Sequence, residues 1–317
     1  MKKLSVSILC TLSILVVSAQ DKSVQEMRDE ASRTIKKDPN DTIPKIWKVG
    51  GFLRFTMTQG YQNNWSAGGD KNTLGLSSFF GGYAFYKKGK SAWDNTLDLA
   101  YGFLSTTSSG SRKSDDKIDV LSKYGYDLGK NWYLSGLVNF RTQFAPGYAY
   151  PSDQTTPVLT SDFLAPAYLI VSPGLNYKPN DEFSFFISPS TWRWTFVKND
   201  SLSAQGAFGV DSGKTVKAEF GAYSTISYTH KINANVVYTG RLDLFSNYEH
   251  NPQDVDVNWT NVLAVKVSGI ITMTATFNMI YDNDVKTVKA DGSPGGPAAQ
   301  IQELLGIGVM FNLKNTK

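Results

Sequence analysis

The chain contains almost none of the residues on which most enzyme active sites depend. Its 317 residues include one cysteine, Cys10, and two histidines, His230 and His250. A single cysteine excludes disulfides within the chain, and two histidines cannot complete a closed zinc site without several carboxylates. No serine stands in a nucleophile elbow. We therefore expect no enzymatic activity, no catalytic residue, no metal ion and no cofactor.

Long hydrophobic runs are absent after residue 19. Met1-Lys2-Lys3, the apolar run Leu4–Val17 and the small pair Ser18-Ala19 follow the order of a secretory signal, with cleavage predicted after Ala19. Further along, no run approaches the roughly 20 apolar residues of a membrane helix, and the mean hydropathy is −0.26. Two destinations remain, an exported soluble protein and a membrane barrel whose alternating strands hide their apolarity from a window average.

A large net charge is missing as well. The chain has 32 basic and 28 acidic residues, and two of the lysines fall in the predicted signal. This balance argues against a polybasic surface, so no nucleic-acid partner is expected. Aromatic residues, in contrast, make up 13% of the chain. They concentrate at the ends of predicted strands, where Tyr and Trp rings lie between hydrocarbon and water, which favours the barrel.

The segment 47–88 shows the pattern most clearly. Leu53, Phe55 and Met57 lie on one face of an alternating run, and Arg54 and Thr56 lie on the other. A period of two predicts a strand. A polar loop reverses the chain, and a second, glycine-rich alternating run follows. Two long strands with charge on one face are typical of a transmembrane β-hairpin.

The same period recurs along the rest of the chain. We predict an all-β fold, a transmembrane antiparallel up-and-down β-barrel of about 12 strands, with short turns on the periplasmic side and longer loops outside. A change of parity beside Pro189 predicts a β-bulge. Segments 105–117, 145–166 and 198–214 are predicted to be loops. The predicted strands are 47–61, 74–86, 93–103, 118–128, 132–144, 167–177, 183–197, 215–229, 234–248, 257–267, 271–282 and 300–313.

The predicted domains are a signal peptide (1–19), a periplasmic N-terminal segment (20–46) and the outer-membrane barrel (47–317). Val24, Met27, Ala31 and Ile35 have helical spacing, which predicts a short amphipathic helix in the second of these. That helix is compatible with a plug, with a docking arm for an envelope protein, or with a frayed leader. The ending 308–313 resembles the signal read by barrel-assembly machinery. The expected partners are that machinery, outer-membrane lipid and lipopolysaccharide.

Charges on the predicted inner face are the candidate functional residues. They would either line an aqueous pore or pair across a narrow lumen. His230 is predicted to be an exposed turn residue. His250, beside Glu249, Asp254 and Asp256, distantly resembles an acidic and histidine site at a barrel rim, but a solvated loop is favoured. The inner-face candidates are Arg54, Asp98, Lys123, Arg141, Glu219, Arg241, Asp243 and Lys266.

Several motifs together carry a resemblance to a known family. They include Asn64-Trp65-Ser66-Ala67-Gly68-Gly69, Trp93-Asp94-Asn95, Lys113-Ser114-Asp115-Asp116-Lys117 and Asn139-Phe140-Arg141-Thr142-Gln143-Phe144. On these motifs the chain resembles the uncharacterised outer-membrane β-barrel family of Bacteroidetes, named only as a domain of unknown function. The resemblance covers about residues 47 to 221 and implies the barrel fold and location in the cell outer membrane. It implies no reaction, and it marks Asn64 and Trp65 as outer-loop candidates.

Two functions are compatible with these observations. The first is a narrow or gated channel for small hydrophilic solutes, which depends on the inward charges. The alternative is a structural or accessory subunit of an outer-membrane envelope complex for assembly, secretion or transport, with a closed lumen.

Overall fold

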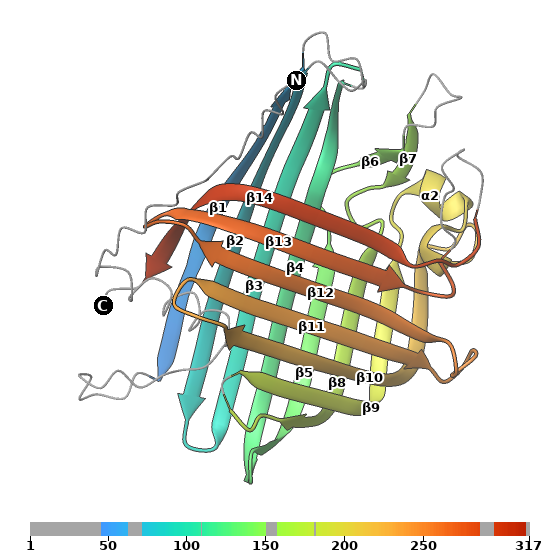
Figure 1. Ribbon diagram of the computed structural model, residues 1–317. Coiled ribbons are helices and arrows are strands. Elements are labelled where there is room, and N and C mark those ends of the chain that lie inside the picture. Colours follow the sequence, from blue (N-terminus) through green and yellow to red (C-terminus); the bar gives the residue numbers. More distant parts are fainter. Residues whose placement is uncertain are drawn as a thin grey trace, which may run out of the picture.

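A computed structural model describes residues 46–62, 72–108, 110–149, 157–180, 182–285 and 295–314 (Figure 1). The predicted signal peptide, the predicted N-terminal helix and the outer-loop candidates Asn64 and Trp65 lie outside these residues. The inner-face candidates all lie within them.

Twelve antiparallel strands close into one barrel, which confirms the predicted fold. Each strand pairs with the next barrel strand along the chain, and the first pairs with the last. The strands are β1 (Trp47–Tyr61), β2 (Asn72–Lys88), β3 (Ser91–Thr106), β4 (Gly110–Gly129), β5 (Trp132–Thr142), β8 (Ala167–Tyr177), β9 (Phe183–Phe196), β10 (Val216–Lys231), β11 (Val236–Asn247), β12 (Val255–Lys266), β13 (Ile271–Tyr281) and β14 (Gln300–Lys314).

The two faces of the wall differ in the way a membrane demands. Outward-facing Met57, Trp93 and Trp259 are exposed, whereas inward-facing Asp119 and Glu219 are buried. A soluble protein would reverse this arrangement. An apolar outer surface around an interior that holds the buried charged groups, with every strand paired on closure, matches a barrel whose solvent is lipid.

Aromatic rings gather at both ends of the wall. Near the short-turn end, where the strands are joined by turns such as 89–90 and 130–131, the Trp47 ring lies 5.1 Å from Tyr86 and 6.0 Å from Trp93. Toward the opposite end, which we call the long-loop end, Trp259 lies 5.5 Å from Phe277. Rings of this kind mark the boundaries between hydrocarbon and water.

The predicted bulge beside Pro189 is confirmed. Across β9 and β10, Ser188 faces Tyr223 and Thr191 faces Gly221, so two residues of β9 oppose one residue of β10. The extra residue changes which face of β9 points inward. A proline fits here because a bulged position lacks a ladder hydrogen bond.

The predicted loop 105–117 is wrong over most of its length. β3 continues to Thr106 and β4 begins at Gly110, with Leu104 facing Arg112 and Phe103 facing Lys113. Residues 110–117 of β4 are polar on both faces of the strand, so no alternation of hydrophobicity marks this part of it. The backbone hydrogen-bond ladder nevertheless continues, because pairing depends on the neighbouring strand and not on apolar side chains.

Two other predicted loops contain secondary structure that the sequence did not indicate. Segment 145–166 carries the hairpin β6 (Gly147–Ala149) and β7 (Val158–Ser161), and segment 198–214 carries α2 (Asp200–Ala204) and a 3-10 turn at Ala207–Gly209. The described residues contain no helix long and apolar enough to cross a membrane. The two segments pack around an apolar cluster that we call the outer-loop core, formed by Ala165, Val197, Leu202 and Val210.

Candidate functional site

Large side chains pack together on the inner face of one half of the wall. They form a cluster that we call the lumen core, and none of its members is more than 7% exposed. The cluster extends from β4 to β11, which are five steps apart in the ring of strands. Half of the wall therefore carries a packed layer on its inner face. The lumen core consists of Leu121, Leu137, Phe186, Tyr223 and Phe245.

Asp119 lies beside the lumen core, and both of its carboxylate oxygens accept hydrogen bonds from neighbouring side chains. Arg141 is its direct partner across β4 and β5. The guanidinium Nε and Nη2 each lie 3.2 Å from the carboxylate Oδ2. Asn139 donates to the other oxygen, Oδ1, at 2.6 Å. A buried carboxylate is retained only with such partners, because an unpaired charge in this environment is costly.

A second pair lies on the other side of the lumen core. Arg241 Nε donates to Asp243 Oδ1 at 2.9 Å, and the Tyr223 hydroxyl donates to the same oxygen at 2.8 Å. Arg241 also interacts electrostatically with Asp119, from β11 toward β4. We name this set the middle cluster. It contains two arginines and two aspartates, so its formal charges cancel.

A third group, the mouth cluster, surrounds Arg193 at the long-loop end. Arg193 Nε donates to Glu219 at 2.8 Å, its Nη1 donates to Asp256, and its Nη2 lies 4.0 Å from Asp282. The guanidinium carbon lies over the Phe245 ring, 4.1 Å from its centre. Charge and ring stacking together orient this one side chain toward three carboxylates, and the ring joins the mouth cluster to the lumen core.

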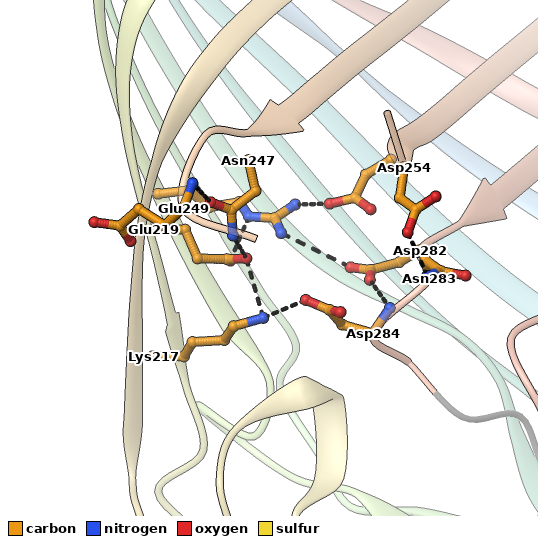
Figure 2. Close-up of polar contacts among 10 residues, drawn as sticks. Lys217, Glu219, Asn247, Glu249, Asp254, Asp282, Asn283 and Asp284 are labelled. Carbon is orange, nitrogen blue, oxygen red and sulfur yellow. Dashed lines mark hydrogen bonds and ion pairs between the residues drawn. The ribbon is translucent and has the colours of Figure 1, made fainter. Parts of the chain in front are cut away.

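Lys217 connects the wall to the segment after β13. Its ammonium lies 3.0 Å from Glu219 and also pairs with Asp284, as Figure 2 shows. Burial raises the pKa of the Asp282 carboxyl, and the Arg193 guanidinium opposes this rise. Counting these six groups, the mouth cluster has four carboxylates and two cations, which gives a local excess of negative charge.

The predicted inner-face residues separate into those that meet and those that do not. Three lie in the middle cluster and one lies in the mouth cluster. Asp98 is 4.0 Å from Lys117, and Lys123 is 3.5 Å from Asn176. Lys266 is 8% exposed on β12. Arg54 lies 5.2 Å from the Phe79 ring centre. The clusters therefore include Arg141, Arg241, Asp243 and Glu219, and leave out Arg54, Asp98, Lys123 and Lys266.

Sequence reasoning missed three central residues. Asp119 lay on the face assigned to the lumen but was not selected. Arg193 alternates with Trp192 and Trp194, so its inward direction was readable from parity. Asp256 was assigned to an outer loop, which is wrong because β12 begins at Val255 and turns Asp256 toward Arg193.

The histidine positions also differ from expectation. His230 is the penultimate residue of β10, not part of a turn, and its Nδ1 lies 3.0 Å from Glu182. The carboxylates near His250 have other partners: Asp254 accepts from Asn283, and Asp256 accepts from Arg193. No group of His, Cys, Asp or Glu within the described ranges is arranged to hold a metal ion.

A protein-family model matches part of the chain. Residues 57–148 match a family described as "Protein of unknown function (DUF3078)". No curated protein matches the chain. The matched segment runs from the end of β1 to the β6 strand and includes Asp119 and Arg141.

Solved outer-membrane barrels resemble the structure at low sequence identity. An outer membrane channel (COG4313) from Pseudomonas putida F1 has 12% identity and a TM-score of 0.37, with 87% of this chain and all of that chain covered. The NanC porin has 11% identity and a TM-score of 0.38, over 83% and 98% of the two chains. The translocator domain of the autotransporter NalP from Neisseria meningitidis has 11% identity and a TM-score of 0.37, over 91% and 95%. The functions in these names belong to those proteins.

Proposed function

We propose that the protein resides in the cell outer membrane and forms a narrow, gated passage for small hydrophilic solutes, without catalytic activity. The observation that carries this proposal is the middle cluster. Its side chains come from β4 and β5 on one part of the wall and from β11 on another, cancel each other's charge, and act on one another electrostatically, which would narrow the lumen without any inserted chain segment among the described residues. Side chains rearrange more readily than a folded plug, so such a constriction is suited to opening.

Energetics favour this proposal over a barrel built only as a scaffold. Replacing a buried ion pair by apolar residues of similar size is often neutral or stabilising. A purely structural interior would therefore gain little from Asp119, Arg141, Arg241 and Asp243. Charged groups on an inner wall become useful when water and solutes enter, as in charged rings of channels.

Single-channel recording in planar bilayers tests the proposal. We expect a small conductance for the refolded protein and a severalfold larger one for Arg141→Ala/Arg241→Ala, which removes both guanidinium groups from the constriction. Lys90→Ala, in the turn between β2 and β3, is the matched control and should conduct like the parent. If the double variant folds but passes no current, the passage does not exist.

A second candidate function is an accessory subunit with a closed lumen. The outer-loop core favours it, because Leu202 is 2% exposed and fixes α2 and the β6–β7 hairpin as a folded surface above the wall. The proposed partners are lipid and lipopolysaccharide around the barrel, barrel-assembly machinery during biogenesis, and an envelope protein bound through residues 20–46. Purification in mild detergent tests this alternative, which predicts a stoichiometric partner and no conductance.

A further inference from the structure

The wall of the barrel splits along part of its closing seam. β1 and β14 are paired from Gly50 with Lys314 to Met57 with Ile307. Beyond that last pair, residues 58–61 of β1 pair only with β2, and residues 300–306 of β14 pair only with β13. In Figure 1 the red β14 crosses the blue β1 near the C-terminus and then diverges from it.

The split extends from the long-loop end past the aromatic rings there, toward the middle of the wall. Glu303 faces Phe277, whose ring contacts Trp259, one of the aromatic residues at the long-loop end. Leu304, Leu305 and Gly306 therefore lie on the hydrocarbon side, which makes the open part about 10 Å long, measured along the strand at ~3.3 Å per residue. Residues 57–61 and 300–305 are exposed whether they face inward or outward, and Leu305 reaches 82%.

An apolar groove of about 590 Å³ begins at the base of this split. Met57 and Ile307, the last paired residues of the seam, both line it. Most of the other lining residues point outward from the wall, so the groove faces lipid. Its apolar lining includes Phe55, Met57, Leu76, Tyr101, Ile307 and Val309.

A cation lies on the inner side of the same seam. Arg54 faces inward three residues before Met57, and its guanidinium lies over the Phe79 ring at 5.2 Å. Asp115 acts on it electrostatically, but Arg54 has no ion pair within 4.0 Å among the described residues. Its donors therefore remain available to an anionic ligand.

We propose that the split seam binds a single-chain anionic amphiphile, such as a long-chain carboxylate. The acyl chain occupies the apolar groove, and the head group passes through the opening to Arg54. The chain covers apolar surface, while the charged head reaches the polar interior instead of hydrocarbon. This site goes beyond the proposed passage for hydrophilic solutes and does not depend on ion conduction.

Fluorescence quenching in phosphatidylcholine vesicles tests the site. A bimane label at Tyr61→Cys, on the outer face of β1 beside the split, reports on palmitate that carries a nitroxide on its chain. A label at Val216→Cys, on the outer face of β10 at the long-loop end, reports on ordinary lipid contact. We expect saturable quenching at position 61 and only gradual quenching at position 216. Nitroxide-labelled phosphatidylcholine should quench both labels gradually.

Substitutions separate the two parts of the site. Arg54→Gln should lower the affinity for palmitate in the saturable phase about tenfold, which corresponds to the loss of one strong charge-assisted hydrogen bond. Arg54→Lys should retain most of that affinity. Met57→Trp should abolish saturation by filling the groove. Val138→Trp, outward on β5, is its control. Each variant is first shown to be folded by its heat-modifiable mobility on gels.

Two results would overturn the proposal. Equal, gradual quenching at positions 61 and 216 would show that only bulk lipid covers the seam, or that a strand from another chain fills it. Unchanged saturation in both Arg54→Gln and Met57→Trp would show that palmitate binds elsewhere.

Discussion

Asp119 and Arg141 are direct partners on neighbouring strands, and two guanidinium nitrogens lie 3.2 Å from one carboxylate oxygen inside the barrel. Asn139 occupies the second oxygen. Both oxygens of the carboxylate thus have hydrogen-bond partners in the protein. Asp119 is 8% exposed, so removal of Arg141 leaves a buried carboxylate without its ion-pair partner, which sets the first prediction.

Arg141→Ala should destabilise the barrel by about 3 kcal/mol, the cost of leaving a buried charge without its partner. Urea unfolding in detergent micelles, followed by tryptophan fluorescence, measures this change. Lys117→Ala is the control: its 4.0 Å pair with Asp98 is about one-third exposed on each side, and exposed pairs contribute below about 1 kcal/mol. Equal losses in the two variants would contradict the assignment of Asp119 as a buried charge.

Lys217→Gln should increase the preference of the passage for cations. The substitution leaves Glu219 and Asp284 without their shared cation and makes the mouth cluster more negative. The measurement is the reversal potential across a potassium chloride gradient. Lys231→Gln, at the other end of β10, adds the same charge change far from the mouth and should have a smaller effect. A shift toward anions would refute the prediction.

Asp282 should make stability depend on pH in a defined direction. Burial raises the pKa of its carboxyl in the folded state, so the folded protein binds more protons than the unfolded chain over the interval from about pH 4 up to the raised pKa. The contribution of Asp282 to the free energy of unfolding therefore falls as the pH rises through that interval. Asp282→Asn removes this contribution, so its stability relative to the parent should rise with pH. A difference that stays constant with pH would contradict the raised pKa.

Gly221→Ala should destabilise the barrel by about 1–3 kcal/mol through overpacking. A Cβ atom at Gly221, beside the bulge, would overlap with the backbone carbonyl oxygen of Ser246. Gly136→Ala provides a matched control on β5, because a Cβ there meets nothing within 4 Å. Urea midpoints of the two variants give the comparison. If Gly136→Ala proves the more harmful, the close approach of β10 to β11 is not the cause.

Leu202→Ala should loosen the outer loops and leave the barrel intact. Leu202 is 2% exposed in the outer-loop core, and truncation of such a leucine costs about 2–5 kcal/mol. Limited trypsin digestion should cut faster after Lys198 or Lys214, while heat-modifiable gel mobility stays normal. Phe163→Ala, in the neighbouring loop and 52% exposed, should leave the digestion rate unchanged. Slower digestion of Leu202→Ala would show that this core is not cooperative.

Local alternation in the sequence predicted the number and order of the barrel strands, and it placed Arg141, Arg241 and Glu219 on the inner face. The alternation is strict where one face of a strand meets lipid, because a shift of one residue would turn the charged side chains into hydrocarbon. It failed at Ser111 and Arg112, where β4 is paired although both faces are polar. It also failed at Leu202, because the residues that form a small core between two loops follow no regular spacing in the sequence.

The amino-acid sequence by itself therefore determined the membrane wall, the inward side of Arg141, Arg241 and Glu219, and the bulge beside Pro189. Only the tertiary structure decided which inward charges meet. Strand stagger and closure set which residues of distant strands share a level of the barrel, and these are properties of the whole ring. The same stagger ends the pairing of β1 with β14 at Met57 and Ile307. No local pattern records where a closing seam stops, because its two strands lie at opposite ends of the chain.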